Sequence, residues 1–228
     1  MAGMTETTRA SRTVFQGRVL RVDVLDIELT GGRRSTREVV QHPGAVVVLA
    51  ERPDGRFVLV RQYRTAIGEV SLEMVAGGLE PGEAPEAAAR RELVEESGYV
   101  AESIRPLGVI VPCPGYSAER LHCFAARVSQ LPGATRPDFD EQVEAVILTR
   151  AEIEAAIMCG ELKDAKSIAI WHLAQPMRYS EQDIASMVGR ALPCAPLAVA
   201  AAVSAAGQSG SGVSPLHLSH PSPTSGHP

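Results

Sequence analysis

Residues 77–99 read GGLEPGEAPEAAARRELVEESGY, a glycine-rich turn followed by an alanine-rich and then acidic stretch. Pro85 suits the first turn of a helix, because proline fixes the backbone angle that a helix needs and has no amide hydrogen to leave unpaired there. Ala87–Ala89 favour a helix, and Gly98 suits the left-handed residue that ends one. We therefore predict a helix over Pro85–Ser97, preceded by a turn.

Three glutamates crowd one side of this predicted helix. Glu92 and Glu96 lie four residues apart and so share a face, with Glu95 beside them. Their charges repel one another unless a cation lies among them, and carboxylate oxygens suit Mg²⁺ or Mn²⁺. The pattern indicates a metal site that a pyrophosphate would complete with its own oxygens. The plain alternative is an acidic helix face exposed to water.

The turn before the helix adds two features to this site. Glycine lets the backbone approach a cation closely, and the carbonyl of Ala76 stands at a suitable place in the sequence to join the metal. Arg91 is expected to pair with Glu83 at the other end of the loop, which would fix the turn against the helix.

The whole stretch resembles the signature of the Nudix hydrolase family. That signature is G-x5-E-x7-R-E-U-x-E-E-x-G-U, with U apolar, and its fixed positions are met by Gly77, Glu83, Arg91, Glu92, Leu93, Glu95, Glu96, Gly98 and Tyr99. So many matches in one window argue against a merely solvated helix. The resemblance implies an α+β fold: an α/β/α sandwich around a mixed central sheet, with a small N-terminal antiparallel sheet.

Four further stretches are similar to the ADP-ribose pyrophosphatase branch of that family. Residues 61–64 read RQYR, and residues 72–77 read LEMVAG where the branch has L-E-x-P-A-G, so Val75 replaces the usual proline. Residues 112–117 read PCPGYS, with Pro114 at the proline that marks the branch, and residues 160–167 read GELKDAKS, similar to G-x-I-x-D-A-K-T. The resemblance covers about residues 14–173.

The resemblance implies a metal-dependent attack of water on one phosphorus of a P–O–P link. Ala76, Glu92 and Glu96 would hold Mg²⁺, with Mn²⁺ as the alternative, and Glu95 and Arg91 would complete the catalytic set. No covalent intermediate is expected, because no Ser-His or Cys-His motif is present.

The same resemblance implies residues that contact the substrate. Arg64, Glu73 and Pro114 would lie against it. The branch is usually a homodimer whose N-terminal sheets contribute to the partner's site, so Arg37 would reach a substrate there. Each has a plain alternative: a surface ion pair for Arg64, a loop cap for Glu73, a solvated strand residue for Arg37 and loop punctuation for Pro114.

An acidic segment, DFDEQVE, precedes the last predicted strand, where relatives carry the general base. Glu141 aligns best with the family pattern D-E-x-E, and we expect it to lie in a mobile loop that closes over the substrate and to act on the attacking water or its metal. Asp138, Asp140 and Glu144 remain alternatives, as does a merely solvated loop acid. His42, His122 and His172 are isolated and are expected to be packed or surface histidines rather than bases.

The reaction that the resemblance favours is hydrolysis of ADP-ribose to AMP and ribose 5-phosphate. The nearest alternative is a pyrophosphatase for GDP-mannose or another sugar nucleotide, because the base is not legible in the sequence. A Nudix-like sensor that binds a nucleotide without cleaving it is a third hypothesis, since fold does not fix function. Such a sensor could lose its metal-binding carboxylates, yet all of them are present here.

Composition limits the other classes of function. A formal net charge of −5 and a pI near 5.7 argue against a broad basic surface for nucleic acid. No apolar run reaches the roughly 20 residues that span a bilayer, and the polar N-terminus lacks the apolar stretch of a signal peptide. The four cysteines are scattered, which indicates reduced thiols. These features predict a cytoplasmic enzyme that binds neither nucleic acid nor membrane.

The rest of the chain divides into three regions. Residues 1–44 form the expected N-terminal sheet and dimerisation region, strand-like from Val14 with a turn at Gly31–Gly32, residues 45–192 the Nudix hydrolase domain, and residues 193–228 a disordered Ala/Ser/Gly/Pro-rich tail. Within the domain we predict strands over residues 45–49, 57–60, 108–111 and 121–128, and helices from Thr149 to Gly160 and from Asp164 to Trp171.

Overall fold

The computed structural model describes residues 4–135 and 142–174. In these residues the elements are, in order, β1 (Glu6–Gln16), β2 (Arg21–Leu29), β3 (Arg34–Gln41), β4 (Ala45–Glu51), β5 (Phe57–Arg64), β6 (Glu69–Gly78), α1 (Pro85–Ser97), β7 (Ala101–Ile110), β8 (Leu121–Val128), β9 (Val143–Leu148), α2 (Arg150–Cys159) and α3 (Ala165–Leu173). The tail predicted over residues 193–228 lies outside the described residues, and the three predicted regions stay a prediction.

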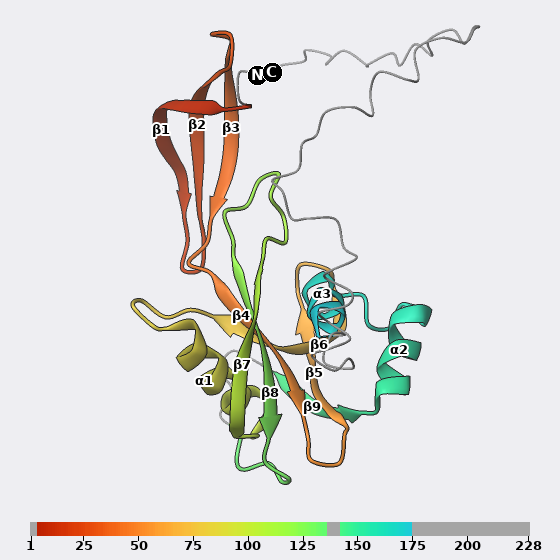
Figure 1. The fold of residues 1–228 in the computed structure, drawn as a ribbon. Helices are drawn as coiled ribbons and strands as arrows, with labels where there is room; N and C mark the ends of the chain where they lie inside the picture. Colours follow the sequence, from red (N-terminus) through yellow and green to blue (C-terminus); the bar gives the residue numbers. More distant parts are fainter. Residues whose placement is uncertain (1–3, 136–141, 175–228) are drawn as a thin grey trace, which may run out of the picture. The chain divides into compact units, whose positions relative to one another are not determined.

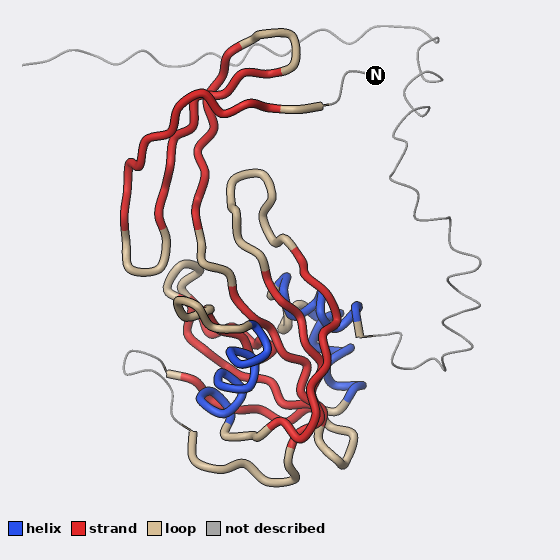
Figure 2. The backbone as a smooth tube through the Cα atoms, turned by 60° about the vertical axis from the view of Figure 1, so that its left-hand side comes forward, coloured by secondary structure: helices blue, strands red, loops and turns tan. Residues whose placement is uncertain are grey.

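The central sheet is mixed, with the strand order β7-β8-β4-β6-β5-β9 (Figure 1). β4 and β8 run parallel, with Ala45 opposite Leu121, and the other pairs are antiparallel. Helix α1 covers one side of the sheet and α2 and α3 the other, so strands lie between two layers of helix (Figure 2). The predicted α/β/α sandwich is confirmed.

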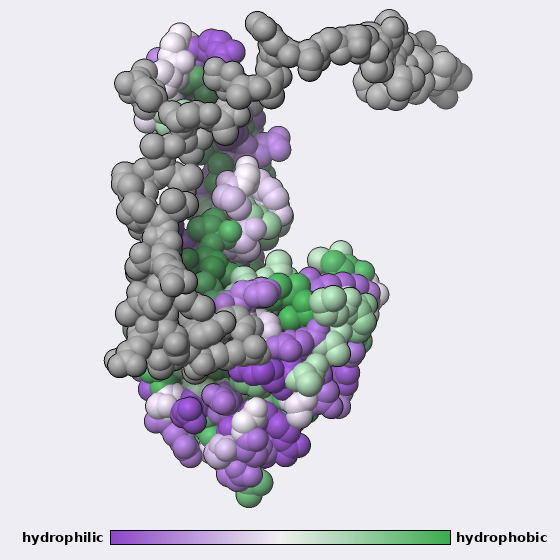
Figure 3. Space-filling view, turned by 45° about the vertical axis from the view of Figure 1, so that its right-hand side comes forward, coloured by the Kyte–Doolittle hydropathy of each residue, from purple (hydrophilic) through white to green (hydrophobic). Residues whose placement is uncertain are grey.

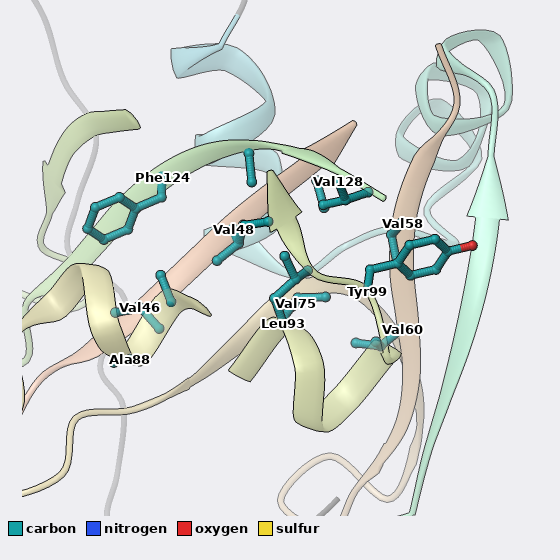
Figure 4. Packing of buried hydrophobic residues seen from close by; sticks show 14 residues of the cluster. Val46, Val48, Val58, Val60, Val75, Ala88, Leu93, Tyr99, Phe124 and Val128 are labelled. Carbon is teal, nitrogen blue, oxygen red and sulfur yellow. The ribbon is translucent and has the colours of Figure 1, made fainter. Parts of the chain in front are cut away.

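Each face of the sheet carries its own hydrophobic core, because successive strand residues point to opposite faces. Val46 and Val48 of β4 pack with Leu93 of α1 on one face (Figure 4). Val47 of β4 packs with Trp171 of α3 on the other face. Trp171 is only 2% exposed and so belongs to this second core.

Helix α1 has the predicted bounds. Pro85 occupies its first turn, and Gly98 ends it in the left-handed conformation, with φ of 73° and its N–H donating to the Val94 carbonyl. Its buried side chains are those at helical spacing on one face: Ala88, Ala89, Glu92, Leu93, Glu96 and Ser97. Two glutamates therefore share the inward face of α1 with the apolar side chains.

Helices α2 and α3 begin at the predicted caps. Thr149 and Glu152 form a capping box at α2, which Gly160 ends with φ of 80°. Asp164 caps α3 by accepting from the Ser167 N–H at 3.0 Å. α3 runs to Leu173, slightly past the predicted end. The Met74 N–H donates to Ser167 Oγ at 2.8 Å, which ties the start of α3 to β6.

The N-terminal strands form a separate three-stranded sheet in the order β1-β2-β3. The predicted turn at Gly31–Gly32 is confirmed, with φ of 95° and 82°. The prediction that strand structure starts near Val14 is wrong, because β1 begins at Glu6. Every residue of β1 is exposed, so the strand has no apolar alternation to reveal it. Pairing with β2 defines β1 instead.

Strand β7 also begins earlier than predicted, at Ala101 rather than Gly108. Pro106 and Gly108 interrupt the sequence pattern, and the ladder with β8 shifts register between them. Such irregularities hide a strand from pattern analysis but are tolerated at a sheet edge, where β7 lies.

The surface seen in Figure 3 is mostly hydrophilic over its lower part, with hydrophobic side chains in small groups. None of the helices in residues 4–135 and 142–174 is long and apolar enough to cross a membrane.

Cys113, Cys123 and Cys159 are free thiols, and burial raises the pKa of the Cys123 thiol to about 11.

Candidate active site

The carboxylate of Glu92 lies directly against the backbone of Gly77, where β6 ends. A Cβ atom added to Gly77 would lie 1.9 Å from the Glu92 carboxyl carbon, so any side chain there would force the Glu92 carboxylate to move. Glu92 itself is 9% exposed. The glycine-rich turn thus lets a carboxylate and the backbone approach each other closely, while the predicted approach of the backbone to a cation stays a prediction.

Glu96 lies one helical turn further along α1 and meets the same strand. It is 4% exposed, and its Oε2 accepts from the Ala76 N–H at 3.2 Å. Glu92 and Glu96 therefore both reach the end of β6 from the inward face of α1. Glu95 lies at the border of this face, with 32% of its side chain exposed.

Arg91 binds three carboxylates at once. It makes two hydrogen bonds of 2.9 Å to Glu83, which confirms the predicted pairing, and it donates to Glu92 at 2.7 Å and to Glu95 at 2.8 Å. It also donates to the Gly78 carbonyl at 3.0 Å. The hydrogen bonds to Glu83 come first among the causes that raise the pKa of Arg91 above its usual range. Arg91 therefore joins the turn, its loop and the helix.

The chemistry of these groups fits a hard divalent cation. Two carboxylates lie at the strand end, one of them directly against the backbone of Gly77, and they offer oxygen ligands alone. Within the part of the chain that the structure describes, no group of three or more Asp, Glu, His or Cys side chains is placed to hold a metal ion. A cation at Glu92 and Glu96 would thus need further oxygens from the backbone, water or a bound ligand.

A second charged cluster joins β5, β6 and the start of α3. Arg64 donates to both oxygens of Glu73, at 2.8 and 2.6 Å, and Lys166 forms an ion pair with the same carboxylate. Lys166 also lies 3.0 Å from Asp164. Two cations therefore share one buried carboxylate, which is 3% exposed.

The pKa of Glu73 records the balance within this cluster. Burial alone would raise it, but hydrogen bonds and charges from Arg64 and Lys166 outweigh burial and lower the pKa to about 2. Glu73 is thus ionised at neutral pH and holds both cations in place.

A cleft of about 880 Å³ brings the two clusters together. Ala76, Gly77 and Gly78 line it from the glycine-rich turn, and Arg64 and Lys166 line it from the charged cluster. The cleft is therefore lined by the backbone of the turn, against which Glu92 and Glu96 lie without lining the cleft themselves, and by two cations that suit phosphate groups. Its size suits a ligand of nucleotide dimensions.

Residues near the N-terminal sheet line another part of this cleft. Arg18, from the β1–β2 loop, contributes there, together with His42 and Glu119. His42 Nδ1 accepts from the Gly44 N–H at 3.1 Å and lies 3.8 Å from Glu119 Oε1. The histidine that the sequence left as an isolated, packed residue thus belongs to the wall of the cleft.

Not every predicted site residue lines the cleft: Arg91, Glu92, Glu95 and Glu96 lie behind the turn without lining it. Glu73 and Pro114 are not among the residues that line the cleft, and Pro114 is exposed in the loop before β8. Arg37 lies on β3 and forms an ion pair with Glu6 of β1. Glu144 is exposed on β9, and Glu141 lies outside the described residues. The substrate contacts predicted for Glu73, Pro114 and Arg37 stay predictions, and so does the choice of Glu141 or Glu144 as the general base.

Sequence reasoning did not assign Lys166, although its motif was visible. The segment DAK carries both the cap of α3 and the lysine, and the two positions lie in the cleft. A lysine in the first turn of a helix that Asp164 caps was therefore the sequence feature that could have indicated Lys166 as a site residue. Nothing local to His42 indicated its position.

The chain belongs to the Nudix hydrolase family: a family model described as NUDIX domain matches residues 40–169, and this range contains the glycine-rich turn, the inward glutamates of α1 and Arg91. Nudix hydrolases generally need divalent metal ions. The donor set at the end of β6 agrees with that requirement.

Three relatives show where the chain lies within the family. It is 38% identical to an ADP-ribose pyrophosphatase of Bacillus subtilis, over 73% of this chain and 91% of that one. It is also 38% identical to a methanol dehydrogenase activator of Bacillus methanolicus, over 72% and 89%. A GDP-mannose pyrophosphatase of Citrobacter koseri is 33% identical over 60% and 76%. The resemblance to the ADP-ribose pyrophosphatase branch is confirmed.

A solved structure described as an ADP compounds hydrolase shares the fold. It matches with a TM-score of 0.68 at 22% identity and covers 78% of this chain and 96% of its own.

Proposed function

We propose that the protein hydrolyses the pyrophosphate bond of a nucleoside diphosphate sugar with bound Mg²⁺, and that ADP-ribose is its substrate, giving AMP and ribose 5-phosphate. The observation that carries this proposal is the cleft that joins the glycine turn, with Glu92 and Glu96 behind it, to Arg64 and Lys166. Hydrolysis of a pyrophosphate needs a metal site for the reacting phosphate and cations for the neighbouring phosphate oxygens within one cleft.

The chain's own residues supply binding and orientation. Arg64 and Lys166, held by Glu73, would bind phosphate oxygens. Arg91 would hold the side chains of Glu92 and Glu95 in place beside the turn. Glu92, Glu96 and the Ala76 carbonyl would hold Mg²⁺, with Mn²⁺ as the alternative; when bound, the metal supplies charge neutralisation and a more acidic water. Glu141 is the group we propose to accept the proton of the attacking water.

The choice of ADP-ribose rests on similarity. The Bacillus subtilis relative bears that activity in its name at 38% identity, while the GDP-mannose relative is 33% identical over a smaller share of this chain. GDP-mannose or another sugar nucleotide is therefore the second candidate. The Bacillus methanolicus relative carries a different name at the same identity, so the substrate needs a direct test.

We also propose a homodimer formed through the N-terminal sheet. Strand β1 is exposed along its whole length and carries Val14 and Phe15, which are 49% and 55% exposed. In such a dimer Arg37 would extend toward the partner's substrate. Exposed apolar side chains on a strand of this kind favour contact with a second chain.

The test is a hydrolysis panel of ADP-ribose, GDP-mannose, NADH, diadenosine polyphosphates and 8-oxo-dGTP, each with Mg²⁺ and with EDTA. The proposal expects the highest kcat/KM for ADP-ribose, with AMP and ribose 5-phosphate as products. Highest activity on GDP-mannose would select the second candidate. Binding of a nucleotide without hydrolysis of any compound would instead favour a sensor.

A further inference from the structure

Gln62 is a buried polar residue of the cleft to which the proposed reaction gives no role. It lies on β5 and continues the row of Val58 and Val60, which pack in the core beneath α1. Its Cα is paired on both sides, with Ser71 of β6 and Val143 of β9, so it belongs to the interior of the sheet. It is 7% exposed, yet it lines the cleft.

The amide oxygen of Gln62 lacks a donor. Oε1 is buried, and among the residues that the structure describes none donates a hydrogen bond to it. A carbonyl oxygen removed from water without a donor destabilises the fold, and a third valine in this row would avoid that cost. A polar group kept at such a position calls for a partner that arrives from outside the described chain.

Neighbouring residues narrow the chemistry of that partner. Arg64 and Lys166 line the same cleft and already donate to Glu73, and as cations they match phosphate oxygens. The bridging phosphates of a nucleoside diphosphate sugar only accept hydrogen bonds at neutral pH, so they do not match the Gln62 oxygen. A hydroxyl group does match it, and sugar hydroxyls lie on both sides of the pyrophosphate.

We propose that Gln62 Oε1 accepts a hydrogen bond from a sugar hydroxyl of the substrate. The residue would thus select pyrophosphates that carry a sugar over those that carry a group without a donor. This inference rests on the proposed function, because that function supplies the sugar.

The test compares wild type with Gln62→Met, which keeps the length of the side chain and removes both amide atoms. Three substrates are used: ADP-ribose, the ethyl ester of ADP, which lacks the terminal sugar, and ADP-ribose built on 2′,3′-dideoxyadenosine, which lacks the nucleoside hydroxyls. We expect kcat/KM for ADP-ribose to fall about three- to tenfold, as one neutral hydrogen bond predicts. For the analogue that lacks the contacting hydroxyl, Gln62→Met and wild type should have the same kcat/KM. The analogue that shows this equality identifies which of the two sugars contacts Gln62.

Two thermal measurements accompany the kinetics. The Tm of ligand-free Gln62→Met should equal or exceed that of wild type, because the substitution removes an unpaired buried oxygen. ADP-ribose in EDTA should raise the Tm of wild type more than that of the variant, since tighter binding gives a larger shift. Gln130→Met, at an exposed residue outside the cleft lining, is the control and should match wild type in every measurement.

Several outcomes overturn the proposal. A lower Tm for ligand-free Gln62→Met, with equal losses on all three substrates, would show that the oxygen has a partner within the protein. If kcat alone fell equally for all three substrates, the Gln62 oxygen would contact the attacking water instead. Unchanged kinetics for all three substrates would show that Gln62 does not contact the substrate. If wild type hydrolyses none of the three compounds, the proposed function fails, and the thermal shift in EDTA still tests the contact by itself.

Discussion

Arg91 organises the glycine-rich turn because one planar side chain carries five donors. It reaches Glu83 in the loop, Glu92 and Glu95 on its own helix, and the Gly78 carbonyl at the strand end. A lysine at this position could not bind in two directions with a fixed fork. The positions of Glu83, Glu92 and Glu95 therefore depend on one guanidinium.

The first prediction concerns the two inward glutamates. Glu92→Gln and Glu96→Gln nearly preserve shape but remove a negative charge from the site, so each should lower turnover roughly a hundredfold or more. Steady-state kinetics at saturating Mg²⁺ measures this. Glu86→Gln is the control on the same helix, because Glu86 is an exposed partner of Arg90 at 3.0 Å and should be nearly neutral. Unchanged turnover in Glu96→Gln would remove it from the metal site.

A second prediction tests the close approach at Gly77. Gly77→Ala places a Cβ atom on the Glu92 carboxyl group, so Glu92 must leave its position. We expect turnover to fall roughly a hundredfold, as for loss of Glu92 itself. Gly133→Ala is the matched control, because its added Cβ would meet only the Gly98 carbonyl oxygen at an ordinary 3.5 Å. Equal activity of the two variants would contradict the geometry.

At the scale of elements, local signals were enough to predict the three helices. Pro85, Gly98, Thr149 and Asp164 each mark an end through their own backbone or side chain. The strand β1 gave no such signal, because all of its residues are exposed and no face of the strand is buried. Sequence patterns thus reveal elements that bury one side and miss those defined by pairing alone.

The candidate site divides in the same way. The glutamates of α1 and Arg91 could be predicted because they lie in one short window with fixed spacing. The ion pair of Glu73 with Lys166 spans 93 residues, and Gln62 reaches the cleft from another strand. No local pattern brings such segments together, since the order of strands in the sheet does so.

A third prediction tests how the Glu73 cluster joins β5, β6 and α3. Glu73 has its pKa lowered from 4.5 to about 2, so its ionised form stabilises the folded state fully above about pH 4.5, and this contribution is lost as pH falls toward 2. Glu73→Gln should therefore lower Tm clearly at pH 7, with a difference from wild type that shrinks between pH 4.5 and 2.

Calorimetry at pH 7, 5, 3.5 and 2.5 measures this difference. Glu69→Gln is the control, because its ion pair with Lys163 is exposed, and such pairs contribute little at any pH. A Tm difference between Glu73→Gln and wild type that stays constant over the whole range would show that the charge of Glu73 is not what holds the cluster.

At the scale of the whole molecule, the central question is whether each site is built by one chain or two. The central fold belongs to the family and the cleft lies within one chain, whereas the N-terminal sheet is present as a single copy. Its assembly was inferred from resemblance, because contacts between chains leave no reliable pattern in a single sequence. The fourth prediction addresses this.

If Arg37 serves the site of a partner chain, mixing two inactive variants restores activity. In a mixed dimer of Arg37→Ala and Glu96→Gln, one site receives an intact Arg37 and an intact Glu96. Random exchange of subunits should therefore recover up to about a quarter of wild-type activity in a symmetric dimer. Light scattering checks the mass. A dimer that shows no recovery would place Arg37 outside the partner's site, and a monomer would reject the assembly.

The most direct test of the proposed activity follows ADP-ribose by ³¹P NMR in the presence of Mg²⁺. We expect the pyrophosphate signals to be replaced by those of AMP and ribose 5-phosphate with wild type, and to persist in EDTA or with Glu96→Gln. Hydrolysis that continues unchanged in EDTA, or no hydrolysis of ADP-ribose or any other sugar nucleotide by folded wild-type protein, would contradict the proposal.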